Sequence, residues 1–213
     1  MFSKRKYFQC LFLLLLVAII LQSCQSNSNP VVERISVKRI VNGEIVEDTS
    51  AYTVPKFKFI NQFGDTVTEK DVAGKYFVAD FFFTKCPSIC PKMKAQMLRV
   101  YEKYGKRNDF LILSHTIDPK RDSVHVLFEF AHKLGIDKNW YFLTGDKEQL
   151  FATADKYLIA AQEDPESPGG FAHSGNFVLA DKDGKIRGYY DGTNPESVDK
   201  LIGDLAKLFK ENP

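Results

Sequence analysis

Two cysteines that stand four residues apart, Cys86 and Cys90, are the side chains of this 213-residue sequence best suited to chemistry. They lie in the stretch FTKCPSICPKM at residues 83–93, directly after an apolar run, and a proline follows each of them. Two thiols at this spacing on a helical turn point to one side, where they could hold a soft metal ion or close a disulfide. The flanking prolines favour exposed rather than buried thiols.

The sequence places Cys86 in a loop and Cys90 in the first turn of the helix that follows. Pro91 agrees with this placement, because proline is tolerated where backbone amides lack an intrahelical partner and is costly deeper inside. The macrodipole and the free N–H groups at a helix start favour the thiolate form of both cysteines. A structural disulfide is the alternative if the protein is exported, but so short a loop would contribute only about 2 kcal/mol.

A further metal ligand would have to come from one of four histidines. His125 and His132 share a predicted helix face, but they lie about 10.5 Å apart along its axis and are expected to be solvated. His115 falls within a predicted strand and is expected to pack or to form a hydrogen bond. His173 is the candidate, because its glycine-rich loop GGFAHSGNF would return beside the cysteines in a thioredoxin-like fold.

Strands and helices alternate from residue 76 onward and would position these side chains. Residues 76–83 form an almost continuous apolar run that is typical of a central strand, and residues 89–104 have helical spacing. The order predicts an α/β, thioredoxin-like fold in which the strands at 76–83 and 110–117 are parallel neighbours. Further strands are predicted at 140–143, 176–181 and 185–190, and further helices at 123–134, at 147–158 and from Asn194-Pro195 onward.

Two hairpins are predicted ahead of this core. The first is an N-terminal extension formed by RISVKRIV and EIVED around the Asn42-Gly43 turn, and the second pairs residues 56–60 with residues 65–67. In the helix predicted at 123–134, an apolar stripe is formed by Val124, Leu127, Phe128 and Ala131.

The amino-terminal region predicts export and a lipid anchor. Three basic residues precede an apolar run at residues 11–21, which is shorter than the roughly 20 residues needed to span a bilayer and indicates a signal peptide. The tetrapeptide LQSC resembles a bacterial lipobox, so residues 1–23 would be removed and Cys24 would carry lipid. Residues 24–30 would form a polar tether and residues 31–213 one domain on the extracytoplasmic, periplasmic side of a bacterial membrane.

Processing would also change the inventory of thiols and charges. Cys10 would leave with the signal peptide and Cys24 would be lipidated, so Cys86 and Cys90 would remain as thiols. Three of the 29 basic residues would leave and none of the 27 acidic ones, so the charges would be nearly balanced. Without a basic surplus, nucleic acid is not an expected partner.

Residues from about 52 to 210 resemble the SCO/SenC family of copper chaperones, which are thioredoxin-like cytochrome c oxidase assembly proteins. The family pattern F-T-x-C-P-x-x-C-P is met at residues 83–91, and IDPKRDS at residues 117–123 resembles V-D-P-x-R-D-[TS]. FLTGD at residues 142–146 and His173-Ser174 before an apolar strand match two further motifs. Departures from residues common in the family occur at Lys85, Ser88 and Val124, and none removes a ligand.

The resemblance implies that one copper ion, as Cu(I) or Cu(II), is bound by Cys86, Cys90 and His173. Two thiolates suit Cu(I), and an added imidazole lets the site also hold Cu(II). It further implies delivery to the CuA-bearing subunit of cytochrome c oxidase or to another cuproprotein. Asp118 is a candidate to support the ligands from the adjacent strand, with an Asp-Pro turn and helix N-cap as the alternative.

A thiol-disulfide oxidoreductase of thioredoxin or peroxiredoxin type, acting without metal, is the rival interpretation. The CxxxC spacing differs from C-x-x-C, and Thr84 stands two rather than three positions before Cys86, unlike the peroxiredoxin pattern. A purely structural lipoprotein would have no use for His173. We therefore expect a metallochaperone, and the sequence leaves open whether thiol-disulfide reduction makes it an enzyme.

Overall fold

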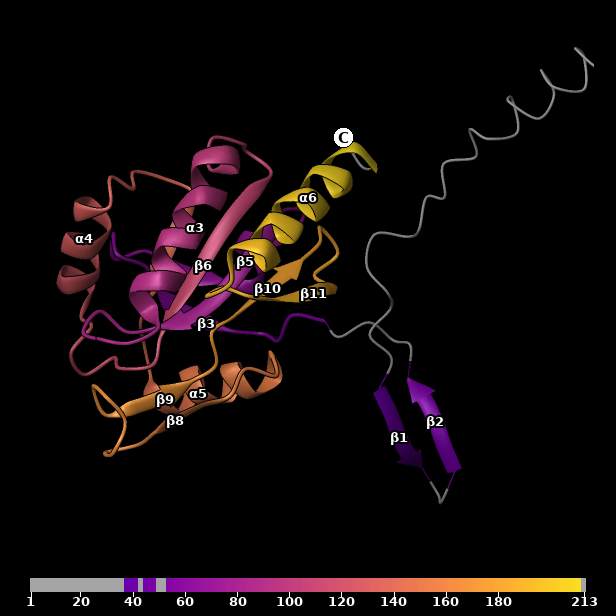
Figure 1. Ribbon diagram of the computed structural model, residues 1–213, viewed down its shortest axis with the longest axis horizontal. Helices are drawn as coiled ribbons and strands as arrows, with labels where there is room; N and C mark the ends of the chain where they lie inside the picture. The colour runs from indigo at the N-terminus through magenta and orange to yellow at the C-terminus, as the bar shows by residue number, and fades with distance from the viewer. Residues whose placement is uncertain (1–36, 42–43, 49–52, 212–213) are drawn as a thin grey trace, which may run out of the picture. The chain divides into compact units, whose positions relative to one another are not determined.

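The computed structural model describes residues 37–41, 44–48 and 53–211 (Figure 1). The first two ranges form an antiparallel hairpin of β1 (Val37–Val41) and β2 (Glu44–Asp48), with Val41 opposite Glu44. The hairpin expected around Asn42-Gly43 is therefore confirmed. The predicted signal peptide, the tether and Cys24 lie outside the described residues. Among the helices described, none has the length and apolar character needed to cross a bilayer.

A five-stranded sheet lies at the centre of residues 53–211, with the strand order β11-β10-β5-β6-β7. The parallel pairing of β5 with β6 confirms the prediction that the strands at residues 76–83 and 110–117 are parallel neighbours. Every residue of these two strands is buried. Continuous burial explains the apolar runs, because helices cover a parallel sheet on both faces. The strands are β5 (Tyr76–Phe82), β6 (Phe110–Thr116), β7 (Trp140–Leu143), β10 (Asn176–Ala180) and β11 (Ile186–Asp191).

Helices pack on both faces of the sheet, and α3 lies beside α6 in Figure 1 while α5 lies on the other side. Successive residues of a strand point to opposite faces. The ring of Phe82 accordingly lies 5.6 Å from that of Phe130 in α4, whereas the ring of Phe81 lies 6.0 Å from that of Tyr157, directly after α5. The helices are α3 (Cys90–Tyr104), α4 (Val124–Lys133), α5 (Lys147–Lys156) and α6 (Pro195–Glu211).

Shorter elements connect these layers. The predicted second hairpin is confirmed as β3 (Lys58–Ile60) with β4 (Thr66–Thr68), and the four-residue helix α2 (Glu69–Val72) follows it. A third hairpin, which the sequence did not predict, pairs β8 (Ala161–Glu163) with β9 (Phe171–His173). His173 therefore ends a strand, and its placement in a loop was wrong.

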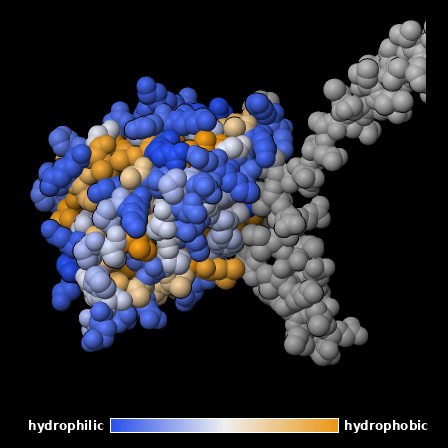
Figure 2. Space-filling view, in the orientation of Figure 1, coloured by the Kyte–Doolittle hydropathy of each residue, from blue (hydrophilic) through white to orange (hydrophobic). Residues whose placement is uncertain are grey.

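The apolar stripe of α4 differs from the prediction at one position. Leu127 and Ala131 are buried, but Phe128 is 42% exposed. Its ring lies 6.3 Å from the ring of Phe63 and stacks 6.4 Å from the ring of His132. Figure 2 shows polar residues over much of the molecular face in view, with apolar residues gathered between α3 and α4.

Candidate metal centre

The two cysteines lie where β5 leads into α3. Cys86 is in the connecting loop and Cys90 is the first residue of the helix, with Pro91 in the first turn, as the sequence predicts. The Cys86 amide donates to the Phe83 carbonyl oxygen at 3.2 Å, so the loop turns back on the strand end. Both cysteines are only 8% exposed, whereas Pro87 and Pro91 are exposed. The expectation of exposed thiols was therefore wrong.

His173 reaches the same point from the end of β9. Its Nε2 lies 3.3 Å from Cys90 Sγ, and its Nδ1 lies 3.1 Å from the Ser174 carbonyl oxygen. Because a carbonyl oxygen can only accept, Nδ1 carries the proton and Nε2 presents its lone pair to the thiols. Burial lowers the pKa of His173, which favours the neutral imidazole that a metal ligand must be.

These three side chains form a group that fits one metal ion. One sulfur from each cysteine and one imidazole nitrogen lie within 4.8 Å of one another. Metal bonds of about 2.0 Å to nitrogen and about 2.3 Å to sulfur, as for zinc, can bridge such separations. The softness of the donors favours copper, since thiolates suit Cu(I) and imidazole also suits Cu(II).

The two thiols differ in acidity. Burial alone would raise the pKa of Cys86, but hydrogen bonds from Cys90 and Ser88 bring that pKa below its ordinary value. Burial raises the pKa of Cys90, and its hydrogen bond to Cys86 raises it further. The prediction that the helix start favours both thiolates therefore holds for Cys86 and was wrong for Cys90, where burial outweighs the dipole.

A small cavity of about 40 Å³ lies beneath the thiols, and Asp80, Ser114 and both cysteines contribute to its lining. Burial raises the pKa of Asp80 to about 7, although the Ser114 hydroxyl donates to its carboxyl oxygen at 2.5 Å. Trp140 Nε1 donates to Ser114 Oγ at 2.9 Å. The floor of the site is therefore a short hydrogen-bonded chain that ends at a carboxyl group.

The remaining histidines behave as the sequence predicts. His115 is fully buried, stacks 4.8 Å from the Phe81 ring, and has Nδ1 3.3 Å from the Asp80 carbonyl oxygen. Burial lowers the pKa of His115 to about 4. His125 and His132 are exposed on α4. His173 is the histidine that the fold brings to the cysteines.

Asp118 has a partner that the sequence did not reveal. Its carboxylate forms an ion pair with Arg121, whose Nη2 donates to the Gly169 carbonyl oxygen at 2.7 Å. The predicted turn is present, since the Arg121 amide donates to the Asp118 carbonyl oxygen at 3.1 Å. The alternative role as N-cap was wrong, because Ser123 caps α4. The role of Asp118 in supporting the ligands stays a prediction.

Comparison with known proteins supplies independent information on this site. Residues 46–210 match the family model described as SCO1/SenC. The SCO1 protein homolog of Bacillus subtilis (strain 168) is 35% identical over 167 residues, which cover 76% of this chain and 86% of that protein.

Two solved structures resemble the chain in fold. BsSco, described as a member of the Sco family of cytochrome c oxidase assembly proteins in which a disulfide switch is identified, is 33% identical. Its TM-score is 0.65, and the match covers 76% of this chain and 96% of that one. Arabidopsis thaliana ScoI with copper bound is 26% identical with a TM-score of 0.60, covering 75% and 99%. These likenesses confirm the predicted thioredoxin-like fold.

Proposed function

This chain belongs to the SCO1/SenC family, and we propose that it is a copper chaperone that binds one copper ion through Cys86, Cys90 and His173. The observation that carries the proposal is the convergence of two sulfurs and an imidazole nitrogen within 4.8 Å. Two thiolates and one imidazole form a donor set that can hold copper in either oxidation state. The copper-bound structure of the Arabidopsis relative supports the same cargo.

The three proposed ligands differ in how readily they reach the protonation state that binds copper. Cys86 is the more acidic thiol, and His173 already presents a lone pair at Nε2. Cys90 must lose its proton when a metal ion binds, because thiolate rather than thiol is the ligand. Burial of both cysteines and partial burial of His173 limit the access of water to the ion.

We propose that the recipient is the CuA-bearing subunit of cytochrome c oxidase or another cuproprotein. The family resemblance and the description of BsSco as a cytochrome c oxidase assembly protein support this partner. Lys85, Pro87 and Ser88 are exposed around the buried thiols and would form the surface that a recipient meets. Lys85 places a positive charge there, which favours a recipient with acidic groups near its own copper site.

We further propose that Cys24 is lipidated and that the domain lies on the extracytoplasmic side of a bacterial membrane. The support is the apolar run at residues 11–21 and the tetrapeptide LQSC. Cys24→Ala should release the protein into the soluble extracytoplasmic fraction or leave an uncleaved precursor, as fractionation and mass spectrometry would show. A variant that is still processed and still membrane-bound would mean that another feature anchors the protein.

Thiol-disulfide reduction is a second candidate function, favoured by the adjacency of two free thiols and by the disulfide switch identified in BsSco. In this reaction the Cys86 thiolate attacks a substrate disulfide, forms a mixed disulfide and releases one substrate thiolate. Cys90 then attacks Cys86 and releases the second substrate thiolate. The substrate gains two electrons, and the Cys86–Cys90 disulfide must be reduced by another dithiol before the next cycle.

Substitution of each ligand separates the two functions. Cys86→Ser or Cys90→Ser should abolish both copper binding and disulfide reduction, because each chemistry needs two sulfurs. His173→Ala should strongly impair copper binding, Cu(II) most of all, while the cysteine pair still cycles with a dithiol reagent. The test is oxidase assembly at low copper. Loss of the CuA signal with His173→Ala supports a chaperone, whereas normal assembly there and failure in both cysteine variants would support a reductase.

A further inference from the structure

A turn at residues 118–122, between β6 and α4, contacts both of the segments that carry the proposed ligands. On the cysteine side, Asp122 is fully buried and accepts hydrogen bonds from the Thr84 amide at 3.1 Å and the Thr84 hydroxyl at 2.5 Å. The Thr116 hydroxyl at the end of β6 donates to the same carboxylate at 2.5 Å. Thr84 stands two residues before Cys86, so Asp122 fastens the cysteine loop to β6.

On the histidine side, Arg121 fastens the β8–β9 hairpin. Its guanidinium pairs with the Asp118 carboxylate, donates to the Gly169 carbonyl oxygen at 2.7 Å and lies 5.8 Å from the centre of the Phe171 ring. Asp118 is itself held in place, because its amide donates to Thr116 Oγ1 at 3.0 Å. The planar fork of arginine can serve a carboxylate and a carbonyl at once, which a lysine ammonium cannot match.

The hairpin needs such fastening because it is small. Each of its strands has three residues, and an isolated two-stranded hairpin is marginally stable in water. Besides Arg121, two contacts hold the hairpin to the domain: the Phe171 ring packs 5.3 Å from the ring of Phe83, and the Glu163 carboxylate pairs with Lys147 of α5 at 2.5 Å. The Ser174 amide donates to the Ala160 carbonyl oxygen at 2.8 Å and extends the pairing between the two strands. A few contacts at its edge therefore decide where His173 stands.

We propose that Asp118, Arg121 and Asp122 form a clamp that holds the two halves of the metal site in register. Arg121, backed by Asp118, is a positioning residue for His173, and Asp122 is a positioning residue for Cys86. None of the three is a ligand. The consequences for copper rest on the proposed function, whereas the consequences for the hairpin and the loop belong to the metal-free protein.

The metal-free protein supplies the first test, through amide hydrogen exchange in Arg121→Ala and Arg121→Lys. Both variants should exchange faster at residues 161–174 than the wild type, including at the Ser174 amide, with lysine giving the smaller increase because it keeps one contact. Exchange in the cysteine loop should stay unchanged. If Arg121→Ala leaves exchange at residues 161–174 unchanged, the clamp does not exist.

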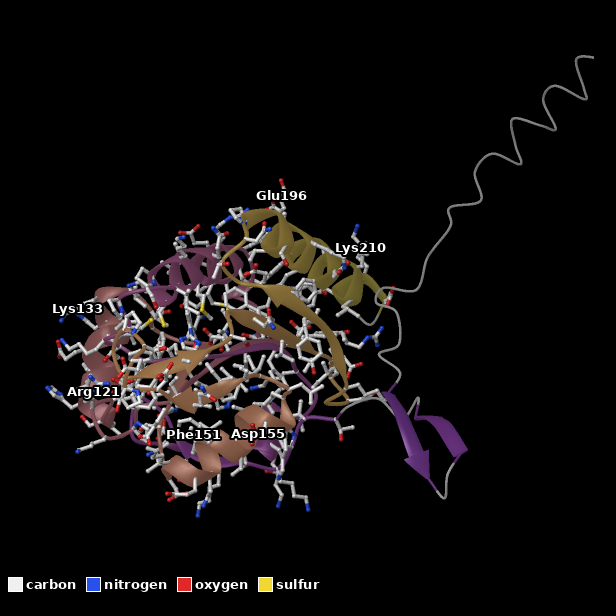
Figure 3. The ribbon with its side chains drawn as sticks, turned by 60° about the horizontal axis from the view of Figure 1, so that its bottom comes forward. Arg121, Lys133, Phe151, Asp155, Glu196 and Lys210 are labelled. Atoms are coloured by element: carbon white, nitrogen blue, oxygen red, sulfur yellow. The ribbon has the colours of Figure 1, made fainter. Side chains whose placement is uncertain are left out.

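Arg99 offers a matched control. It too forms an ion pair, with Asp199, and donates to a backbone carbonyl oxygen, that of Pro195 at 3.5 Å. These contacts join α3 to α6, and Figure 3 labels Glu196 on α6 across the domain from Arg121. Arg99→Ala should leave exchange at residues 161–174 at the wild-type rate. An increase equal to that of Arg121→Ala would show general loosening and overturn the proposal.

Copper binding and cysteine alkylation supply the second test, because loss of Arg121 should disturb His173 whereas loss of Asp122 should disturb Cys86. Arg121→Ala should weaken Cu(II) binding by about tenfold or more, the usual cost of losing a supporting residue, and should weaken the nitrogen signature in the electron paramagnetic resonance spectrum. Cu(I) binding should change less, since both thiolates stay in place. Asp122→Asn should instead change the alkylation rate of Cys86, and it should leave hairpin exchange unchanged.

The two proposals can fail separately. If the wild-type protein binds no copper, the chaperone function falls while hydrogen exchange and alkylation still decide the clamp. If the wild-type protein binds copper and Arg121→Ala has the wild-type Cu(II) affinity and spectrum, the clamp is overturned while the chaperone function stands.

Discussion

The cysteine half and the histidine half of the proposed metal site differ in the secondary structure that supports them. Cys86 follows β5, whose seven residues are all buried, and Cys90 begins α3, a helix of 15 residues. His173 ends a strand of three residues that pairs with another strand of three. The thiols are fixed by a buried strand and a long helix, whereas the position of the imidazole depends on a few contacts of the β8–β9 hairpin. Disturbing the hairpin should therefore affect Cu(II) more than Cu(I), because Cu(II) depends more on the nitrogen donor.

The largest effect on stability is expected from the carboxyl group under the cysteine half. The pKa of Asp80 is raised by burial to about 7 from an ordinary value of 3.8. Between these values the folded protein binds more protons at Asp80 than the unfolded chain does, so the contribution of Asp80 to stability is largest below pH 4 and is lost as pH rises to 7. At about 1.36 kcal/mol per pKa unit, the loss is at most about 4 kcal/mol.

Asp80→Asn should remove that pH dependence, because the neutral amide resembles the protonated acid and can still accept from Ser114. Urea unfolding of both proteins between pH 4 and pH 8 would measure it. The wild type should lose stability relative to the variant as pH rises through this range. A difference that stays constant with pH would show that Asp80 titrates normally and that the floor of the cysteine half is not a neutral acid.

An intermediate effect is expected in the histidine half, as the difference between alanine substitutions at two glycines with nearly equal backbone angles. Gly169 has φ +90° and Gly170 has φ +89°, so alanine at either position costs about 1 to 2 kcal/mol of backbone strain. A Cβ at Gly169 would also lie 2.7 Å from the Phe83 ring, whereas a Cβ at Gly170 would meet no atom within 4 Å. Overpacking of this kind costs about a further 1 to 3 kcal/mol.

Gly169→Ala should therefore lower stability and Cu(II) affinity more than Gly170→Ala does. Thermal unfolding and Cu(II) titration of the two variants would measure the difference, and the shared backbone strain cancels between them. Equal losses in both variants would mean that the contact between the hairpin tip and the Phe83 ring does not position His173.

The smallest effect is expected at the helix start. Pro91 lies in the first turn of α3, where its missing N–H costs little. Pro91→Ala should change the free energy of unfolding by no more than about 1 kcal/mol, against about 3 kcal/mol for proline inside a helix. Denaturant unfolding gives the value. A strong stabilisation by alanine would place Pro91 inside the helix and remove the basis for locating Cys90.

The cysteine half and the histidine half also differ in how well the sequence predicts them. The strand and helix around the cysteines were predicted because the run at residues 76–83 is long and apolar and Pro91 marks a helix start. The β8–β9 hairpin was missed because three residues are too few to show alternation. His173 was still found, through its glycine-rich segment and its place in a family motif.

Contacts between residues that lie far apart in the sequence could not be predicted. Asp122 bonds to a residue 38 positions away and Arg121 to one 48 positions away, and no local pattern encodes either pairing. The segment IDPKRDS drew attention only as part of a family motif. The pKa of Cys90 was misjudged for a related reason, since the helix-start argument omits the burial that the tertiary fold imposes.

The central claim is that one copper ion is held by two sulfurs and one imidazole nitrogen, and X-ray absorption spectroscopy of the copper-loaded domain tests it most directly. The spectra of the wild type and of His173→Ala would be compared at one copper per chain, in the Cu(I) and Cu(II) states. We predict two sulfur ligands and one imidazole in the wild type, and loss of the imidazole alone in the variant. An imidazole signal that persists in His173→Ala, or a wild-type site without two sulfur ligands, would contradict the account.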